Sequence, residues 1–162
     1  MGRKLVIITG PTAVGKTDFC IEAALKYGSP VISCDSRQIY KEMTIGTAVP
    51  DASQLAAVKH YFIHSIHVTE PYSSGQYEID ALTLIDRLFS EGRETLVMCG
   101  GSGFYIDAVC NGLDCLPVPP PELREELTQR VKTEGVGALA EELRRLDPKA
   151  WEAIDIHNGQ RV

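Results

Sequence analysis

The sequence has no apolar run long enough to cross a membrane. A membrane-spanning helix needs about 20 consecutive apolar residues, whereas the run at residues 5–8 is ended by Thr9, Gly10 and Pro11. The same run is too short for a secretory signal peptide, which also requires a cleavage site of small residues. These absences exclude a protein with membrane-spanning helices, and they predict a cytoplasmic protein that makes no contact with a membrane.

The sequence also lacks paired cysteines and an excess of positive charge. It has five cysteines, an odd number, and no Cys-x-x-Cys pair. They are Cys20, Cys34, Cys99, Cys110 and Cys115. This scatter is typical of reduced thiols and argues against a disulfide framework or a zinc site. The net charge of −6 argues against a general nucleic-acid binder, because phosphate backbones are held largely by Lys and Arg. Residues 1–50 carry a slight positive excess, which permits a local basic face.

What the sequence does contain is an alternation of short apolar segments with amphipathic ones. Residues 4–9, 30–34 and 95–99 are typical of buried strands, and residues 16–27 and 77–90 of amphipathic helices. This alternation predicts an α/β fold in which helices cover a parallel sheet. A length of 162 residues is enough for one such domain with a proper core.

Two stretches interrupt the alternation. Residues 38–70 are less regular, and residues 117–121 include four prolines, which cannot continue a helix and mark a linker. After the linker, residues 122–134 and 136–146 are predicted to form two charged helices, followed by a turn at Asp147 and Pro148. The character of the chain therefore changes near residue 116.

The strongest motif follows the first predicted strand and opens the first predicted helix. It matches G-x-x-x-x-G-K-[ST] at every fixed position and comprises Gly10, Pro11, Thr12, Ala13, Val14, Gly15, Lys16 and Thr17. Its backbone N–H groups and the helix N-terminus can converge on an anion. Lys16 then reaches terminal phosphate oxygens, and the Thr17 hydroxyl suits Mg²⁺. The motif predicts a diphosphate or triphosphate site and leaves the reaction open.

An acidic residue follows the second predicted strand rather than the third. Residues 95–99 end in two glycines, whereas residues 30–34 are followed by Asp35. Because the carboxyl ends of strands in an open parallel sheet face the ligand crevice, we expect Asp35 within reach of the phosphates. There it can act as a general base or hold Mg²⁺ indirectly; the alternative is an aspartate that only caps a helix or a turn. Ser102, which follows the two glycines, either presents its hydroxyl to the same crevice or belongs to a plain turn.

Several blocks together resemble the tRNA dimethylallyltransferases, also called tRNA isopentenyltransferases or IPP transferases. The phosphate-binding motif, residues 33–40 (SCDSRQIY) and residues 43–48 (MTIGTA) are the most specific part of this resemblance. Shorter matches run through nearly the whole chain, at residues 60–63, 72–73, 100–106, 111–113, 121–124, 147–148 and 158–161.

The resemblance implies a fold and a domain organisation. The fold would be P-loop NTPase-like, with an incomplete core domain at residues 1–115. Residues 116–162 would begin a helical insertion domain that clasps the tRNA. Members of the family are usually near twice this length, so we expect the chain to be an N-terminal part whose insertion domain is truncated.

The resemblance also implies an activity. Members transfer a dimethylallyl group from dimethylallyl diphosphate to N6 of the adenosine next to the anticodon on its 3′ side. The catalytic residues would be Asp35 as the base, Lys16 and Thr17, with Mg²⁺ at Thr17. The partner would be the anticodon stem-loop of tRNA and the protein a monomer. Contacts to tRNA would come from Asp35, Ser36, Arg37, Gln38, Ser102, Arg124, Gln160 and Arg161.

One departure from the family pattern and two alternative functions stay open at this point. Members often have two adjacent histidines where this chain has His60 and Tyr61, so we interpret His60 as a packing or surface residue. The alternatives are a phosphotransferase that uses the same loop on a small metabolite, and a fragment that binds diphosphate without turnover.

Overall fold

The computed structural model describes residues 2–113 and 119–162, in two compact units. These units are Met1–Asp114 and Cys115–Val162, and each is described by itself. The predicted division after residue 115 and the first two residues of the predicted proline-rich linker, 117 and 118, lie outside the described residues.

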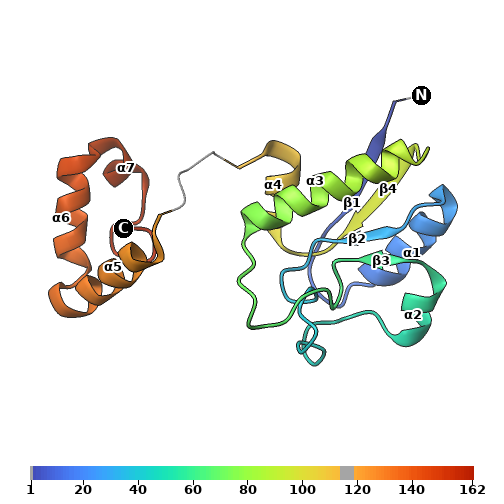
Figure 1. Cartoon of the computed structure of the whole chain (residues 1–162), viewed down its shortest axis with the longest axis horizontal. Helices are drawn as coiled ribbons and strands as arrows, with labels where there is room; N and C mark the ends of the chain where they lie inside the picture. Colours follow the sequence, from blue (N-terminus) through green and yellow to red (C-terminus); the bar gives the residue numbers. More distant parts are fainter. Residues whose placement is uncertain (1, 114–118) are drawn as a thin grey trace. The chain divides into compact units, whose positions relative to one another are not determined.

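A parallel sheet forms the centre of the first unit (Figure 1). Its strands are β1 (Lys4–Ile8), β2 (Val31–Ser33), β3 (His60–Tyr61) and β4 (Thr95–Cys99), in the spatial order β1-β4-β2-β3. Ile8 pairs with Cys99 on one side of β4, and Ser33 pairs with Cys99 on the other. The carboxyl ends of β1, β4 and β2 therefore meet at one edge of the sheet. The α/β fold with a parallel sheet is confirmed.

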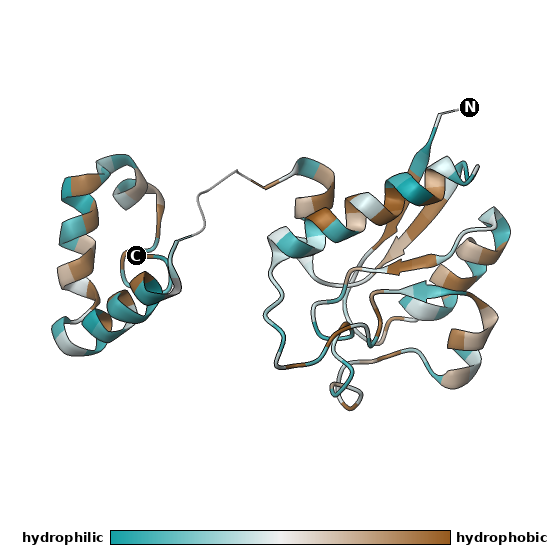
Figure 2. Ribbon diagram, in the orientation of Figure 1, coloured by the Kyte–Doolittle hydropathy of each residue, from teal (hydrophilic) through white to brown (hydrophobic). Residues whose placement is uncertain are grey.

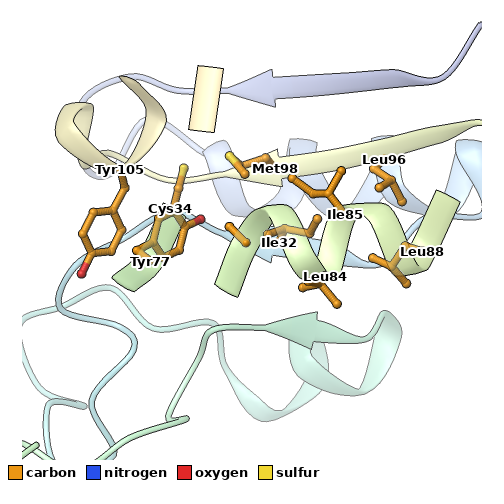
Figure 3. Packing of buried hydrophobic residues seen from close by; sticks show 10 residues of the cluster. Ile32, Cys34, Tyr77, Leu84, Ile85, Leu88, Leu96, Met98 and Tyr105 are labelled. Atoms are coloured by element: carbon orange, nitrogen blue, oxygen red, sulfur yellow. The ribbon is translucent and has the colours of Figure 1, made fainter. Parts of the chain in front are cut away.

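Helices cover both faces of this sheet. They are α1 (Lys16–Tyr27), α2 (Ala52–Ala57), α3 (Ser74–Ser90) and α4 (Gly103–Asn111). Alternate strand residues point to opposite faces, so Ile32, Leu96 and Met98 pack with α3 while Val31 and Val97 pack with α1. Figure 3 shows Ile85 and Leu88 of α3 beside Leu96 and Met98, and Leu84 belongs to the same cluster. Figure 2 shows the hydrophobic strands and the alternating hydropathy of α3.

Local sequence signals explain where these helices begin and end. Helix α1 ends before Gly28, whose φ of +61° is the left-handed conformation that glycine adopts without strain. Helix α3 begins after Ser73, whose hydroxyl accepts a hydrogen bond from the Gln76 N–H. The irregular segment at residues 38–70 contains the short helix α2, which Asp51 and Gln54 start with a capping box, and the two-residue strand β3.

The second unit is helical. It consists of α5 (Pro121–Glu134), α6 (Val136–Leu146) and α7 (Pro148–Ala153). An ion pair of 2.7 Å between the Arg130 Nη2 and Glu142 Oε2 atoms joins α5 to α6. The two charged helices that the sequence predicts are confirmed. At Asp147 and Pro148, where we predicted only a turn, Asp147 instead caps α7 by accepting a hydrogen bond from the Ala150 N–H.

Among the described helices of both units, none has the length and hydropathy that a membrane span requires.

Candidate functional site

The phosphate-binding motif forms a loop between β1 and α1. Ala13 and Gly15 have φ values of +66° and +85°, and Lys16 is the first residue of α1. No side chain of the described residues caps this helix, so its first N–H groups keep their capacity to bind an anion. The Lys16 ammonium donates a hydrogen bond to the Pro11 carbonyl across the loop. The loop therefore offers an ammonium group and backbone donors at one place.

A cavity of about 260 Å³ lies against this loop. Of the residues predicted to bind diphosphate, those that line it are Thr12, Ala13, Gly15, Lys16 and Thr17. Gly10, Pro11 and Val14 complete the loop. Asp35 and Gln38 line the same cavity from the end of β2. The structure thus brings the phosphate loop and the predicted base to one cavity, as the parallel arrangement of the strands led us to expect.

The two carboxylate oxygens of Asp35 have different surroundings. Its Oδ1 atom accepts hydrogen bonds from the Arg37 N–H at 2.9 Å and the Gln38 N–H at 3.2 Å. Asp35 therefore caps the turn that it begins. Its Oδ2 atom has no hydrogen-bond partner among the described residues, so one carboxylate oxygen keeps its capacity to accept a proton or a hydrogen bond.

The backbone before this turn is fixed from two sides. The Cys34 N–H donates to the Cys99 carbonyl at 2.8 Å, and the Tyr77 hydroxyl donates to the Ser33 carbonyl at 2.9 Å. Gly100 lies so close that a Cβ atom placed on it would be 2.5 Å from the Cys34 carbonyl carbon. Only glycine permits this approach, which fixes the position from which Asp35 enters the cavity.

Ser102 fixes the same turn from the start of α4. Its hydroxyl accepts a hydrogen bond from the Ser36 N–H at 2.8 Å and donates to the Ser36 hydroxyl at 3.1 Å. Its own N–H donates to the Cys34 carbonyl at 3.2 Å. The structure therefore gives Ser102 a clear role in holding residues 34–36, while its contact with tRNA stays a prediction.

Gln38 connects β2 to the loop at residues 43–48. Its Nε2 group donates to the carbonyls of Thr47 at 3.1 Å and Ala48 at 2.9 Å, and its Oε1 atom accepts from the Ser33 hydroxyl at 3.2 Å. The amide group is thus engaged inside the chain. Gln38 shapes the cavity wall in this structure, and an additional contact with tRNA stays a prediction.

A second cavity, of about 480 Å³, lies beyond the Asp35 turn. It shares no residue with the first, but the adjacent pairs Asp35–Ser36 and Gly101–Ser102 contribute one member to each. Aromatic side chains make up much of its wall, namely Tyr40, Tyr72, Phe104 and Tyr105. The structure therefore has a cavity with aromatic walls next to the polar cavity that the phosphate loop lines.

The remaining residues predicted to contact tRNA are spread over the two units. Arg37 is exposed in the Asp35 turn. Arg124, Gln160 and Arg161 line a groove of the second unit, together with apolar residues such as Leu127 and Val131. Each unit therefore holds part of the predicted set, and contact of these residues with RNA stays a prediction.

Sequence reasoning missed several residues of the first cavity. His60 is half-buried in the cavity wall, where its Nδ1 atom lies 2.8 Å from the Val58 carbonyl and burial lowers the pKa of its imidazole. Cys20 and Cys99 also line the cavity. Neither thiol stands in a motif, and His60 enters the wall only because β3 pairs with β2 at Val31. Pairing between strands this short leaves no sequence signal.

The oxygen atoms at the cavity fit a magnesium ion that is held mainly by the phosphates of a bound molecule and only partly by the protein. Thr17, Asp18 and Asp35 supply hydroxyl and carboxylate oxygens to its wall. In the described part of the chain no three His, Cys, Asp or Glu side chains form a metal-binding group. This donor set suits Mg²⁺, which keeps several waters and binds through few protein oxygens plus phosphates.

Comparison with known proteins gives consistent results. The family model described as IPP transferase matches residues 38–162. A protein of Parabacteroides distasonis named tRNA dimethylallyltransferase 2 is 45% identical over 160 residues, covering 99% of this chain and 53% of that protein. A protein of the same name from Porphyromonas gingivalis is 46% identical over 158 residues, covering 98% of this chain and 52% of its own length. The chain thus spans about half the length of the curated relatives it matches.

Solved structures also resemble the chain, including the following two. The tRNA isopentenylpyrophosphate transferase of Bacillus halodurans is 34% identical, with a TM-score of 0.66 over 99% of this chain and 53% of that protein. A eukaryotic dimethylallyltransferase crystallised while acting on tRNA has a TM-score of 0.82 at 21% identity, over 99% of this chain and 40% of that one. The second likeness concerns the fold alone.

Proposed function

The chain belongs to the IPP transferase family, and from this premise we propose that it supplies the donor-binding and catalytic part of a tRNA dimethylallyltransferase. The reaction transfers a dimethylallyl group from its diphosphate to N6 of the adenosine next to the anticodon on its 3′ side. The observation that carries this proposal is that Asp35 and the phosphate loop line one and the same cavity.

The phosphate loop binds the diphosphate of the donor. Backbone N–H groups at the start of α1 and the Lys16 ammonium face the phosphate oxygens, and the hydroxyls of Thr12 and Thr17 add further donors. Negative charge accumulates on these oxygens as the carbon–oxygen bond breaks. Because the donors are in place before the reaction, they stabilise this charge more than they stabilise the bound donor.

Asp35 accepts the proton that the adenine amine loses. As the bond from N6 to the allylic carbon forms, the bond from that carbon to the diphosphate oxygen breaks, and one N6 proton passes to the carboxylate. The Oδ2 atom, which has no partner in the described part of the chain, is the proton acceptor in this scheme. The Oδ1 atom keeps the carboxylate oriented through the turn.

Residues present at the cavity would hold Mg²⁺ through the Thr17 hydroxyl, and the carboxylates of Asp18 and Asp35, which line the same cavity, would accept hydrogen bonds from its waters. When bound, the ion neutralises charge on the diphosphate.

The aromatic cavity beyond the turn is the entry for the adenine. An enzyme that modifies a base must take that base out of its stack and hold it between apolar side chains, a description that fits Tyr40, Tyr72 and Tyr105. Ser36 lines this second cavity and Arg37 is exposed in the same turn, and both would contact the nucleotide. Residues 1–115 would form the core domain, and residues 116–162 the beginning of the tRNA-clasping domain, with Arg124, Gln160 and Arg161 on the RNA.

The test combines two measurements on this chain. Calorimetry with pyrophosphate and Mg²⁺ measures donor-site binding, and mass spectrometry of an unmodified anticodon stem-loop incubated with dimethylallyl diphosphate measures transfer. We expect binding and a prenylated adenosine. Phosphate transfer from ATP to small acceptors without prenylation would favour the phosphotransferase, and binding without transfer would favour a diphosphate-binding fragment. A chain that binds no pyrophosphate would contradict the proposal itself.

A further inference from the structure

Two cysteines stand side by side in the wall of the first cavity. Cys20 lies in the second turn of α1 and Cys99 at the end of β4, and both line the cavity. Both also belong to the apolar cluster between α1 and the sheet, with Ala24, Val31 and Val97 as their neighbours. None of the functions assigned above uses them.

The two thiols differ in access and in charge. Cys20 is 1% exposed, whereas Cys99 keeps partial access from the cavity. The neighbouring Cys20 thiol and the Lys16 ammonium lower the pKa of Cys99, although burial and Asp35 oppose this change. The proximity of Cys99 and burial raise the pKa of Cys20. Cys99 is thus the thiol with greater thiolate character, and Cys20 is the protonated thiol beside it.

We propose that Cys20 and Cys99 form a peroxide-sensitive dithiol, whose conversion to a disulfide closes this cavity to diphosphate. The inference rests on two neighbouring thiols that share one cavity wall with Lys16, and its effect on ligand binding rests on the proposed function.

The reaction with a hydroperoxide balances in two steps. The Cys99 thiolate attacks one peroxide oxygen; the sulfur–oxygen bond forms, the oxygen–oxygen bond breaks, and the departing hydroxide or alkoxide takes up a proton. Cys20 then attacks the sulfur of the Cys99 sulfenic acid, forming the disulfide while hydroxide leaves and takes the Cys20 proton as water. The two thiols are oxidised by two electrons, and the peroxide is reduced.

Oxidation of Cys20 and Cys99 is expected to affect diphosphate binding because of where the two residues lie. Cys20 lies three residues after Thr17 on the helix that begins at the phosphate loop, so a covalent bond to β4 fixes that helix against the sheet. A sulfenic acid on Cys99 adds a polar oxygen to a cavity of only about 260 Å³. The sulfenic acid therefore competes for space that a diphosphate would use, and the disulfide restrains the helix whose first turn would bind it.

Two other cysteines serve as internal controls. Cys34 is fully buried on the α3 side of the sheet, where burial raises its pKa to about 12. Cys110 is exposed on α4 and does not line the cavity. Access alone would make Cys110 react first. Reaction at Cys99 before Cys110 therefore separates the proposed site from ordinary surface oxidation.

The experiment treats the full reduced chain with limiting hydrogen peroxide and maps its thiols by mass spectrometry. Digestion with trypsin and Asp-N places each cysteine on its own peptide, with Cys20 in residues 18–26 and Cys99 in residues 94–106. We expect a disulfide between these two peptides, loss of pyrophosphate binding, and recovery of both on reduction. Pyrophosphate with Mg²⁺ at one hundred times its Kd should slow the oxidation about a hundredfold, because only the free site reacts.

Variants identify the role of each thiol. Cys20→Ala should stop the reaction at a Cys99 sulfenic acid, which dimedone traps. Cys99→Ser should leave Cys20 reduced and pyrophosphate binding insensitive to peroxide, and Cys110→Ser should change nothing. Because Cys20 is buried, Cys20→Ser offers a second variant should the alanine variant unfold.

The outcomes separate this inference from the proposed function. Oxidation of Cys110 or Cys34 before Cys99, or an unchanged rate with pyrophosphate bound, would overturn the dithiol proposal. A reduced chain that binds pyrophosphate but forms no Cys20–Cys99 disulfide would contradict this inference alone. A reduced chain that binds no pyrophosphate would contradict the proposed function, whatever its thiols do.

Discussion

The two walls of the first cavity are built in different ways. On the phosphate-loop side, the shape comes from the backbone conformation at Ala13 and Gly15. Among the described residues, Lys16 makes the one side-chain hydrogen bond within residues 10–17, to the Pro11 carbonyl. On the Asp35 side, side chains from distant segments hold the backbone, as Ser102 holds Ser36. One wall is therefore local in sequence, and the other depends on the whole fold.

This difference bears on how each wall responds to substitution. A local loop loses a ligand contact when one of its side chains is removed, but keeps its shape. A wall held by contacts between distant residues changes shape when one of those contacts is removed. The following predictions use this contrast, from the largest expected effect to the smallest.

Asp35→Asn should reduce the rate of prenyl transfer by roughly 10²–10⁴-fold, the usual contribution of a general base. Asparagine keeps an oxygen for the N–H groups of Arg37 and Gln38, so the turn should persist and pyrophosphate affinity should change little. Single-turnover kinetics measure the rate, and calorimetry measures the affinity. Asp86→Asn, on the exposed side of α3, is the matched control. Loss of Mg²⁺-dependent pyrophosphate binding would instead indicate a metal-holding role.

Lys16→Ala should weaken pyrophosphate binding roughly 10- to 150-fold, because a hydrogen bond to a charged group contributes about 1.5–3 kcal/mol. The stability of the fold should change little, since the loop conformation comes from its backbone. Isothermal calorimetry and urea unfolding together measure both quantities. Lys26→Ala, in the last turn of the same helix, should leave binding unchanged; equal losses in the two variants would contradict a specific role for Lys16.

Gly100→Ala should destabilise the first unit by about 1–3 kcal/mol, the usual effect of overpacking. The added Cβ would lie 2.5 Å from the Cys34 carbonyl carbon and 2.6 Å from its oxygen, and a backbone neighbour cannot move aside easily. The midpoint of urea unfolding measures this loss. Gly101→Ala is a sharp control, because its Cβ would meet the Gly10 carbonyl oxygen at an ordinary 3.9 Å. Equal stability of the two variants would contradict the close approach.

Ser102→Ala should cost about 1 kcal/mol of stability, because the Ser36 N–H loses its acceptor. The transfer rate should fall more than the pyrophosphate affinity, since the Asp35 turn is loosened while the phosphate loop is untouched. Ser102→Thr retains the hydroxyl and should preserve both. If Ser102→Ala lowered the affinity and left the rate unchanged, the separation between the two walls would be wrong.

Much of the framework could be predicted from the sequence because it depends on local signals. The strand–loop–helix order could be predicted from the motif at residues 10–17 and the apolar runs at residues 4–9 and 95–99. The same signals predicted that the ligand site lies at the carboxyl ends of the strands. The placement of Asp35 in the same cavity followed from the rule that parallel strands end at one edge.

The rest of the site depends on contacts that no local pattern encodes. The Gln38 side chain could be assigned to tRNA only by resemblance, whereas in the structure its amide binds the carbonyls of Thr47 and Ala48. Ser102 meets Ser36 across 66 positions of the sequence. Cys20 and Cys99 entered no sequence argument as a pair, because it is the packing of α1 on β4 that makes them neighbours.

The strand order β1-β4-β2-β3 determines when parts of the sheet can pair during synthesis. β1 and β2 do not pair with each other, and each completes its hydrogen bonding only against β4, at residues 95–99. During synthesis, which proceeds from the N-terminus, the segment carrying Lys16 and the segment carrying Asp35 thus lack a common partner until Cys99 has left the ribosome. Because β4, the last of the four described strands in sequence, stands between β1 and β2, the cavity that joins Lys16 to Asp35 can form only after residues 95–99 are made, through contacts of high sequence separation.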